Sequence, residues 1–350
     1  MRFSFCGEWN TLKDKPLVET GTSAKTGQPW VKIKFTVKSG PDRVIVEAFA
    51  GKQDPLRIIT REGTRIEVPW AERENQDILN SAMNHYIVNL TGDRKVFLSQ
   101  YDQIQYLAEA LPELKGRVIV TGRVDVSYYN GQWYTRYTIQ NVYKAEEGNT
   151  TRLFLSGDII FNRDSIDKSA YQRDGILTIN GLTPQYIDKD HPNALVPQTF
   201  VMNISRLDRS IQKQNDAVKI REQFLTPLTR GWTRSSWEMI QKNGQEEMPF
   251  DESMLTPTQK LALSTGEYTL DDFKPTKKIY GERVNQIRLY RPIIRNEYSN
   301  GPVEFADDAT VEALIYRPSQ VMEVKTVRDD GVLGLDKTDM DDLFDNELFD

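Results

Sequence analysis

Residues 115–143 read KGRVIVTGRVDVSYYNGQWYTRYTIQNVY, and this stretch decides the fold class that the sequence predicts. On both sides of its centre, apolar side chains alternate with polar ones, which is the period of a β-strand with one buried face. At the centre stands Asn130-Gly131, a dipeptide favoured in two-residue hairpin turns because both positions need a positive φ. The stretch therefore predicts a β-hairpin with one buried face.

Pairing outward from that turn assigns the side chains of the hairpin to two faces, because cross-strand partners share a face. The apolar face pairs Tyr128 with Trp133, Val126 with Thr135, and Val124 with Tyr137. The other face is aromatic and basic, and it carries Tyr129, Ser127 with Tyr134, Asp125 with Arg136, and Arg123 with Thr138. Tyrosines beside arginines suit stacking on bases and pairing with phosphates. The alternative is an ordinary exposed face with a surface ion pair between Asp125 and Arg136, and the pattern alone leaves both open.

Residues 30–51, WVKIKFTVKSGPDRVIVEAFAG, predict a second hairpin around a turn at 39–42. Its apolar face pairs Val37 with Val44, Phe35 with Val46, and Ile33 with Ala48. The opposite face combines cations with two aromatic rings, and it carries Trp30, Lys32 beside Phe49, Lys34 beside Glu47, and Lys38 beside Arg43. We interpret this face as a positive stripe with stacking platforms. A lysine-protected edge strand is the alternative, but it leaves Trp30 and Phe49 on the same side unexplained.

The order of the predicted elements is that of one known barrel. A first strand falls within residues 1–20, and a helix at 101–114 separates the two hairpins. Three strands, a helix and two more strands are the order of an OB-fold, a five-stranded Greek-key barrel. Residues 1–147 therefore resemble the OB domain of single-stranded-DNA-binding proteins, a resemblance that implies nucleic-acid contacts through aromatic and basic groups on the strands. Residues 52–98 exceed a minimal OB-fold, and we expect there two hairpins and a short helix in an elaborated loop, or a different register.

A second β-rich domain is predicted for residues 152–328. Its first segment, RLFLSGDIIFN at 152–162, weakly repeats the pattern of GRVIVTGRVDVS at 116–127, which would fit an OB-like barrel here too. Strand patterns return at 284–296 and 309–324 and would complete that barrel. The intervening residues 206–278 show few strand patterns, so we expect an inserted helical or irregular segment. We interpret Trp232 and Trp237 within it as buried side chains rather than a contact patch.

Composition narrows the function classes. At 350 residues the chain is long enough for two domains with full cores. A single cysteine, Cys6, excludes internal disulfides and indicates a reducing compartment. The two histidines, His85 and His191, stand far apart, which argues against zinc and against a Cys/His nucleophile pair. The N-terminus lacks a signal-peptide pattern and no apolar run could cross a bilayer, so we expect a cytoplasmic protein with no cofactor, no metal and no membrane partner.

The charge is distributed unevenly along the chain. Residues 329–350 hold nine acidic side chains against Lys337 alone, a net of −8, so the total of −6 leaves +2 for the rest. With few apolar residues for its charge, this acidic tail should be disordered in the free protein. It repeats one short motif, Asp342-Leu-Phe-Asp345 and Glu347-Leu-Phe-Asp350. The repeat suits capture by a partner, and the tail can also compete electrostatically with a nucleic acid for the protein's own basic groove. A merely solubilising tail would leave the repeated Leu-Phe unexplained.

An acidic tail with a hydrophobic tip behind an OB-fold resembles bacterial single-stranded-DNA-binding protein and, more closely, the bacteriophage replication versions. In those families the tail recruits replication and repair enzymes, which implies a partner-binding role here for Asp342, Leu343, Phe344, Asp345, Leu348 and Phe349. The bacterial tip ends on Phe, whereas Asp350 follows Phe349 in this chain. That difference argues against a pocket built for a terminal Phe carboxylate.

These observations predict a non-enzymatic protein that binds single-stranded DNA in replication, recombination or repair and recruits replication or recombination proteins through its tail. The expected DNA-binding residues are Trp30, Lys32, Lys34, Lys38, Arg43, Phe49, Arg123, Tyr129, Tyr134 and Arg136. An alternative is a structural or adaptor virion protein that uses β domains for assembly. An OB-containing enzyme such as a nuclease or ligase is another, although no Walker-type phosphate loop is present and the acidic cluster of the tail lacks the spacing of a calcium loop.

Overall fold

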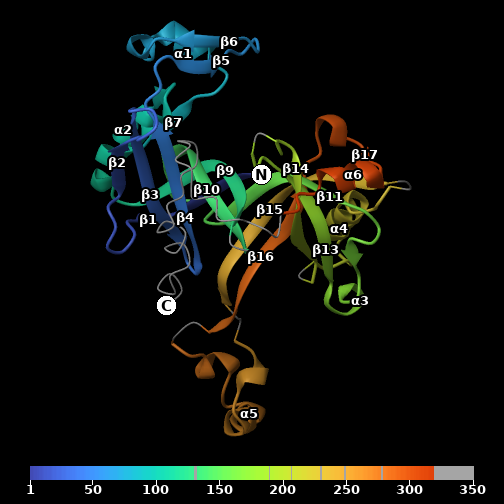
Figure 1. Ribbon diagram of the computed structural model, residues 1–350. Coiled ribbons are helices and arrows are strands. Elements are labelled where there is room, and N and C mark those ends of the chain that lie inside the picture. Colours follow the sequence, from blue (N-terminus) through green and yellow to red (C-terminus); the bar gives the residue numbers. More distant parts are fainter. Residues whose placement is uncertain are drawn as a thin grey trace.

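The computed structural model describes residues 1–129, 132–188, 190–205, 207–228, 231–247, 250–276 and 279–318. Its architecture is mainly β, with helices short and placed at the periphery (Figure 1). Two groups of strongly twisted strands stand side by side and share hydrogen bonds (Figure 1). Each group forms a ring, because its strands close on themselves.

The first ring contains five strands: β1 (Arg2–Asn10), β3 (Pro29–Ser39), β4 (Asp42–Gly51), β9 (Arg117–Tyr129) and β10 (Gln132–Lys144). They pair in the order β1–β3–β4–β10–β9 and back to β1, with only β4 and β10 parallel. Helix α2 (Gln100–Glu113) lies between the third and fourth strands in sequence. This is the Greek-key barrel of the OB-fold, so the predicted fold class is confirmed.

The predicted registers of both hairpins are confirmed as well. In β3 and β4, Phe35 stands opposite Val46 and Lys32 opposite Phe49. In β9 and β10, Val126 stands opposite Thr135 and the pairing continues to Gly122 before an irregularity in the register. The alternation of apolar and polar residues sets these registers because a slip of one residue would turn every apolar side chain to the wrong face.

The second ring repeats this strand order. It contains β11 (Leu153–Phe161), β13 (Ile176–Gln185), β14 (Ala194–Asn203), β15 (Trp232–Glu247) and β16 (Tyr280–Pro292). They pair as β11–β13–β14–β16–β15 and back to β11, again with one parallel pair, β14 and β16. Helix α4 (Gln212–Phe224) takes the place that α2 has in the first ring. The division into domains at 1–147 and 152–328 stays a prediction.

The expectation of a helical or irregular insertion over 206–278 was wrong for β15. Every second residue from Thr233 to Gln241 is buried. Of these, Thr233, Ser235 and Gln241 are polar, and only Trp237 and Met239 are apolar. The polar members find partners inside the sheet, as Ser235 does by accepting a hydrogen bond of 2.8 Å from the Trp237 indole. A buried strand with hydrogen-bonded polar residues shows no hydropathy alternation, which is why its pattern was missed.

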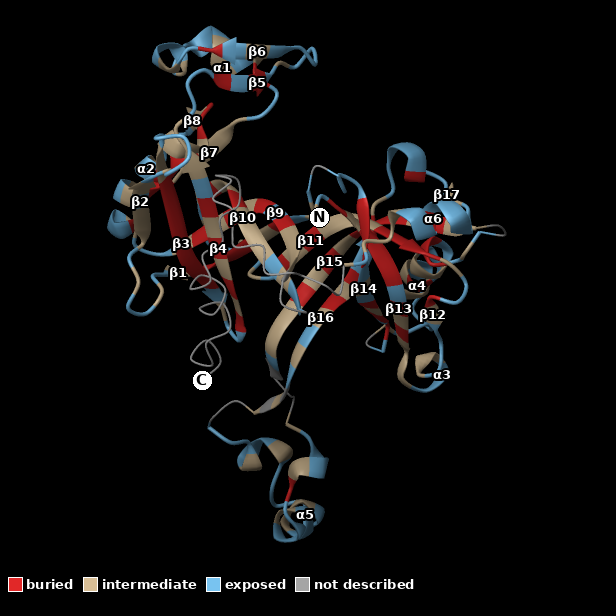
Figure 2. Ribbon diagram, in the orientation of Figure 1, coloured by how far each residue is buried: buried red, intermediate tan, exposed pale blue. Residues whose placement is uncertain are grey.

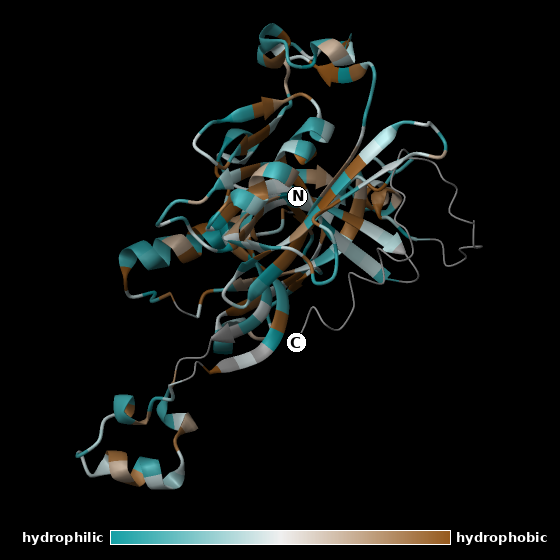
Figure 3. Cartoon of the chain, turned by 90° about the vertical axis from the view of Figure 1, so that its left-hand side faces the viewer, coloured by the Kyte–Doolittle hydropathy of each residue, from teal (hydrophilic) through white to brown (hydrophobic). Residues whose placement is uncertain are grey.

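The rest of that region is helical, as expected. Residues 250–276 contain η2 (Glu252–Met254), α5 (Pro257–Ser264) and η3 (Leu270–Phe273). They project from the far end of β15 and β16, away from both rings (Figure 3). Of the two predicted buried tryptophans, Trp237 is fully buried. Trp232 is half-buried, and its indole donates a hydrogen bond of 3.0 Å to Asp308.

Residues 56–81 of the block at 52–98 form a second projection, at the top of Figure 2, whereas residues 86–97 lie beside the first ring. The block contains the expected hairpins, β5 (Leu56–Ile59) with β6 (Arg65–Val68) and β7 (Tyr86–Asn89) with β8 (Lys95–Phe97), together with η1 (Trp70–Glu72) and the short helix α1 (Gln76–Ser81). A small hydrophobic cluster of its own holds β5, β6 and α1 together. Strand β7 pairs in parallel with β10, which attaches the block to the first ring.

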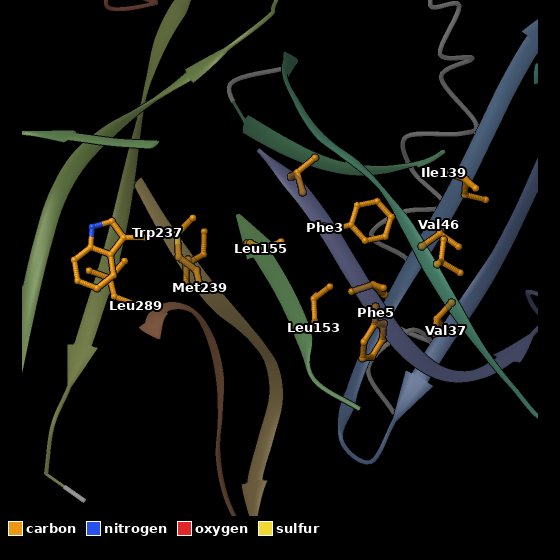
Figure 4. Packing of buried hydrophobic residues seen from close by; sticks show 14 of the residues in the cluster. Phe3, Phe5, Val37, Val46, Ile139, Leu153, Leu155, Trp237, Met239 and Leu289 are labelled. Atoms are coloured by element: carbon orange, nitrogen blue, oxygen red, sulfur yellow. The ribbon is translucent and has the colours of Figure 1, made fainter. Parts of the chain in front are cut away.

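The two rings are joined through β1. The first residues of β1 pair with β9 on one side and with β11 on the other, with Phe3 opposite Leu155. One hydrophobic core therefore runs from Phe5 and Ile139 in the first ring to Trp237 in the second (Figure 4).

Smaller elements complete the described chain: β2 (Val18–Thr22) beside β3, β12 (Ile166–Asp167) beside β13, β17 (Val303–Ala306) beside β15, and α3 (Tyr171–Asp174), η4 (Asn296–Tyr298) and α6 (Asp308–Leu314). Among the described residues, no helix has the length and apolar character that a membrane span requires.

Candidate nucleic-acid interface

Two aromatic side chains pack together on the second and third strands of the first ring of strands. Trp30 on β3 and Phe49 on β4 have ring centroids 5.7 Å apart, with their planes inclined at 37°. The indole rests against Gly21 of β2, where an added Cβ would lie only 2.5 Å from the indole carbon Cζ2. Phe49 is 48% exposed. Trp30 is half-buried, so the open part of this aromatic surface is mainly the Phe49 ring.

Lys32 and Lys34, which follow Trp30 on the same face of β3, do not form the open positive stripe that we expected. Lys32 and Lys34 are buried, at 9% and 8% exposure. On the sheet, Lys32 stands between Glu19 of β2 and Phe49, and Lys34 stands beside Glu47 of β4. Each of these lysines therefore has an acidic residue directly opposite it on a neighbouring strand. These two side chains are therefore not the exposed phosphate-tracking groups of the prediction.

Arg136 of β10 is also engaged within the protein. Its Nε donates to the Glu47 carboxylate at 2.6 Å, and the two side chains are only 21% and 12% exposed. Asp125, its direct neighbour across the hairpin, instead accepts a hydrogen bond of 2.6 Å from Thr138 and lies 3.8 Å from Arg123. The surface ion pair weighed as the alternative, between Asp125 and Arg136, is replaced by a partly buried one between Arg136 and Glu47.

Exposed cations of the predicted set lie at Lys38 and Arg123, and Arg43 is half-buried. Tyr134 is half-buried on the same face of the sheet as Arg136, and its hydroxyl lies 3.5 Å from Gln132 Oε1. The side chain of Tyr129 and the turn at 130–131 lie outside the described residues, as do Asp342, Leu343, Phe344, Asp345, Leu348 and Phe349 of the predicted tail.

A cavity of about 950 Å³ lies between the two rings. The first ring contributes the β3–β4 turn and the outer half of the β9–β10 hairpin, and the second ring contributes β13, β14, β15 and β16. The apolar face predicted for the β9–β10 hairpin is buried at Val124, but farther out Trp133 is 38% exposed and lines the cavity. The hairpin extends past the end of the barrel, so its apolar face meets the cavity instead of a core.

Positive and amide side chains dominate the polar lining of this cavity. Its cations are Lys38, Arg43 and Arg283, and no Asp or Glu is found among the described residues that line it. Its amides come from three strands of the second ring: Gln198, Gln241, Asn243, Gln245, Asn285 and Gln286. Sequence reasoning brought Lys38 and Arg43 together but missed the amides, because they come from strands far apart in the chain. The only sequence signal was the amide-rich stretch QKNGQ at 241–245.

One buried ionic contact ties the rings together beside this cavity. Asp42, in the β3–β4 turn, lies 3.2 Å from Lys242 Nζ of β15 and accepts a hydrogen bond of 3.2 Å from the Asn243 backbone. The Asn243 side chain donates to the Arg43 carbonyl oxygen at 3.3 Å. Asp42 is buried, and its negative charge is paired with the Lys242 ammonium group of β15. In the described part of the chain, no cluster of three or more His, Cys, Asp or Glu side chains could hold a metal ion.

Comparisons with known proteins give few matches. No family model and no curated protein matches the sequence. Among solved structures, the fold is similar to the wild-type single-stranded DNA binding protein from Thermus aquaticus, with 12% identity, a TM-score of 0.27, and coverage of 69% of this chain and 86% of that one. A deletion mutant of the same protein gives 11% identity, a TM-score of 0.28, and coverage of 69% and 87%. At such low TM-scores the fold assignment rests on the strand pairings themselves.

Proposed function

We propose that this protein binds single-stranded DNA without catalysing a reaction, in DNA replication, recombination or repair. The observation that carries the proposal is the aromatic pair of half-buried Trp30 and exposed Phe49 on the second and third strands of an OB barrel. That face is where OB-folds bind oligonucleotides. Bases stack on aromatic side chains largely regardless of base identity, because every base has a π-face.

Phosphate contacts in this proposal come from the accessible cations farther along the strands of the first ring. Lys38, Arg43 and Arg123 take that role, whereas Lys32, Lys34 and Arg136 act mainly within the sheet. The affinity then falls with salt, with a slope of about −0.7 per neutralised phosphate in a log–log plot. A protein that recognised only bases would show a much flatter salt dependence.

The acidic tail completes the proposal. We propose that residues 329–350 recruit replication or recombination proteins through the repeated Leu-Phe motif, in the manner of bacteriophage replication proteins. The same charge would let the tail compete with DNA for the protein's cations. The expected compartment is the cytoplasm, of a bacterial host if the protein is viral, and no cofactor is required.

Stacking can be tested with the variants Trp30→Ala and Tyr134→Ala in titrations with fluorescent oligothymidine. Because each stacked base contributes about 1–3 kcal/mol, Trp30→Ala should weaken binding roughly 5- to 100-fold, and Tyr134→Ala should also weaken it. The matched control is Tyr186→Ala. It removes an exposed aromatic side chain that follows β13 in the second ring of strands. Unchanged affinity in both Trp30→Ala and Tyr134→Ala would exclude this face. A wild-type protein that does not bind oligothymidine would favour an assembly or adaptor role.

A further inference from the structure

We propose that the cavity between the two rings is a second contact site for single-stranded nucleic acid, in which amide side chains contact the edges of bases. This inference rests on the proposed function and adds to it a dependence on base composition. Stacking on Trp30 and Phe49 does not discriminate between bases, whereas hydrogen bonds to base edges do.

Charge is the first argument for an anionic ligand. The chain as a whole carries a net charge of −6. The cavity nevertheless collects Lys38, Arg43 and Arg283 with no carboxylate among its described lining residues. The nearest acidic group in the adjoining turn, Asp42, is buried and paired with Lys242. A hollow lined by cations attracts anions, and its walls concentrate that attraction.

Hydrogen-bonding chemistry is the second argument. Amide side chains present a donor and an acceptor side by side, and such groups read the edges of bases. The Gln241 amide donates a hydrogen bond of 2.6 Å to Asn285 Oδ1, which fixes the orientation of both groups at the cavity wall. Gln198 on β14 adds an amide from another strand, and Gln245 adds one farther along β15. A site for phosphate alone would not need this many amides.

Shape and position are the third argument. About 950 Å³ is at the upper end of the range for pockets that enclose small organic ligands, so parts of a nucleotide chain fit inside. Trp133 and Tyr137 supply rings at the wall. Lys38 lies eight residues after Trp30 on the same strand, a span of about 26 Å at the usual rise per residue. One bound strand can therefore stack on Trp30 and continue to the cavity.

The first test adds a negative charge to the cavity wall. Asn285→Asp keeps the oxygen that Gln241 needs, and it should weaken oligonucleotide binding about fivefold or more at low salt because it repels phosphates. Asn80→Asp is the matched control, since Asn80 also accepts a side-chain amide hydrogen bond, from Gln76, but lies in the block at 52–98. Equal effects of the two variants would overturn the inference. Tighter binding by Asn285→Asp would also overturn it, because the cavity would then hold the acidic tail instead of DNA.

The second test concerns base composition. The double variant Gln198→Met and Gln245→Met keeps the side-chain length and removes two amides. Its affinity ratios among oligo-dA, oligo-dC and oligo-dT should differ from the wild-type ratios by about fivefold for at least one pair. Trp30→Ala should weaken all three oligonucleotides to a similar extent. Unchanged ratios in the double variant would refute base reading in the cavity while leaving the proposed function intact. Failure of the wild type to bind any of the three would refute the proposed function itself.

Photocrosslinking tests the same inference on the wild-type protein, so it does not require any variant to fold. Bromouracil-substituted oligonucleotides, irradiated with the full-length protein and mapped to single residues, should crosslink to Trp133 or Tyr137 of the cavity as well as to Trp30. Crosslinks restricted to Trp30 and Phe49 would show that the strand does not enter the cavity.

Discussion

Gly122 of β9 stands opposite Ile139 of β10 and Phe3 of β1 in the first ring. An added Cβ at this position would lie 1.9 Å from the Thr138 carbonyl oxygen and 2.9 Å from the Phe3 ring. Those atoms belong to the neighbouring strand and to the core, so they cannot move aside cheaply. A single glycine therefore permits the hairpin to close against β1.

We predict that Gly122→Ala lowers the free energy of unfolding by about 1–3 kcal/mol, because the methyl group overpacks the barrel. Urea-induced unfolding followed by circular dichroism measures the change. Gly51→Ala is the control, since its added Cβ would lie 4.0 Å from the Pro29 carbonyl oxygen, an ordinary van der Waals contact. Equal stability of the two variants would contradict this account of Gly122.

The two arginines of the β9–β10 hairpin have different roles. Arg136 is held by the partly buried Glu47, whereas the Arg123 side chain is largely exposed. We predict that Arg136→Met costs about 2 kcal/mol of stability, because it leaves Glu47 without its charged partner. Arg123→Met should leave stability nearly unchanged and instead flatten the salt dependence of oligonucleotide binding. Unfolding curves and salt titrations of both variants check this, and the reverse assignment of effects would contradict it.

At the scale of elements, the sequence predicted strands whose apolar residues alternate and missed β15, whose buried residues are largely polar. The strand predicted over 309–324 was also wrong at its start, where helix α6 lies. The hairpins at 30–51 and 115–143 were placed in register because turn chemistry and alternation agree. Strand β15 escaped because Thr233 and Ser235 are buried through hydrogen bonding and close packing rather than hydrophobicity. Burial of Lys32 and Lys34 was missed for a related reason, since a lysine has an aliphatic stem that packs on a sheet.

Helices α3 and α4, beside the second ring of strands, are linked through the side chain of Tyr171. The Tyr171 hydroxyl of α3 donates to the Glu222 carboxylate of α4 and accepts a hydrogen bond of 3.0 Å from Arg209. Burial, together with the hydrogen bond to Glu222 and its charge, raises the pKa of Tyr171 to about 12. In the unfolded chain the pKa of a tyrosine is about 10. The folded protein thus keeps this proton to a higher pH than the unfolded chain does.

The stabilising effect of Tyr171 is therefore complete below pH 10 and is lost as the pH rises from about 10 to about 12. We predict that Tyr171→Phe makes the fall in thermal midpoint over this pH range less steep. Melting curves at closely spaced alkaline pH values measure it. Tyr186→Phe, at an exposed position, is the control. A variant whose alkaline profile matches the wild type would show that the α3–α4 contact does not depend on this proton.

At the scale of the whole molecule, the position of the cavity follows from how the rings are joined. β1 pairs with β11 at one point, and the β3–β4 turn contacts β15 at another, through Asp42 and Lys242. These two partners are 200 residues apart in the chain, so no local pattern indicates that they meet. Each ring of strands is a local consequence of strand order, whereas the site between the two rings exists only in the assembled protein.

The charge of the whole molecule yields the last prediction. Removing residues 329–350 changes the net charge from −6 to +2, so the truncated protein should bind oligothymidine more tightly than the full chain. Electrostatic competition is screened over about 10 Å at 0.1 M salt, so the gain should be largest at low salt and should shrink as salt is added. Fluorescence titrations at several salt concentrations measure both effects.

A second variant separates charge from the Leu-Phe repeat. It keeps the length of the tail but replaces its nine acidic residues with Asn or Gln. If charge alone causes the competition, this neutral tail should bind DNA as tightly as the truncated protein does. If the Leu-Phe motif itself occupied the binding surface, the neutral tail would still inhibit binding, and the inhibition would persist at high salt because burial of apolar surface is not screened. Equal affinities of all three proteins at every salt concentration would show that the tail does not compete with DNA.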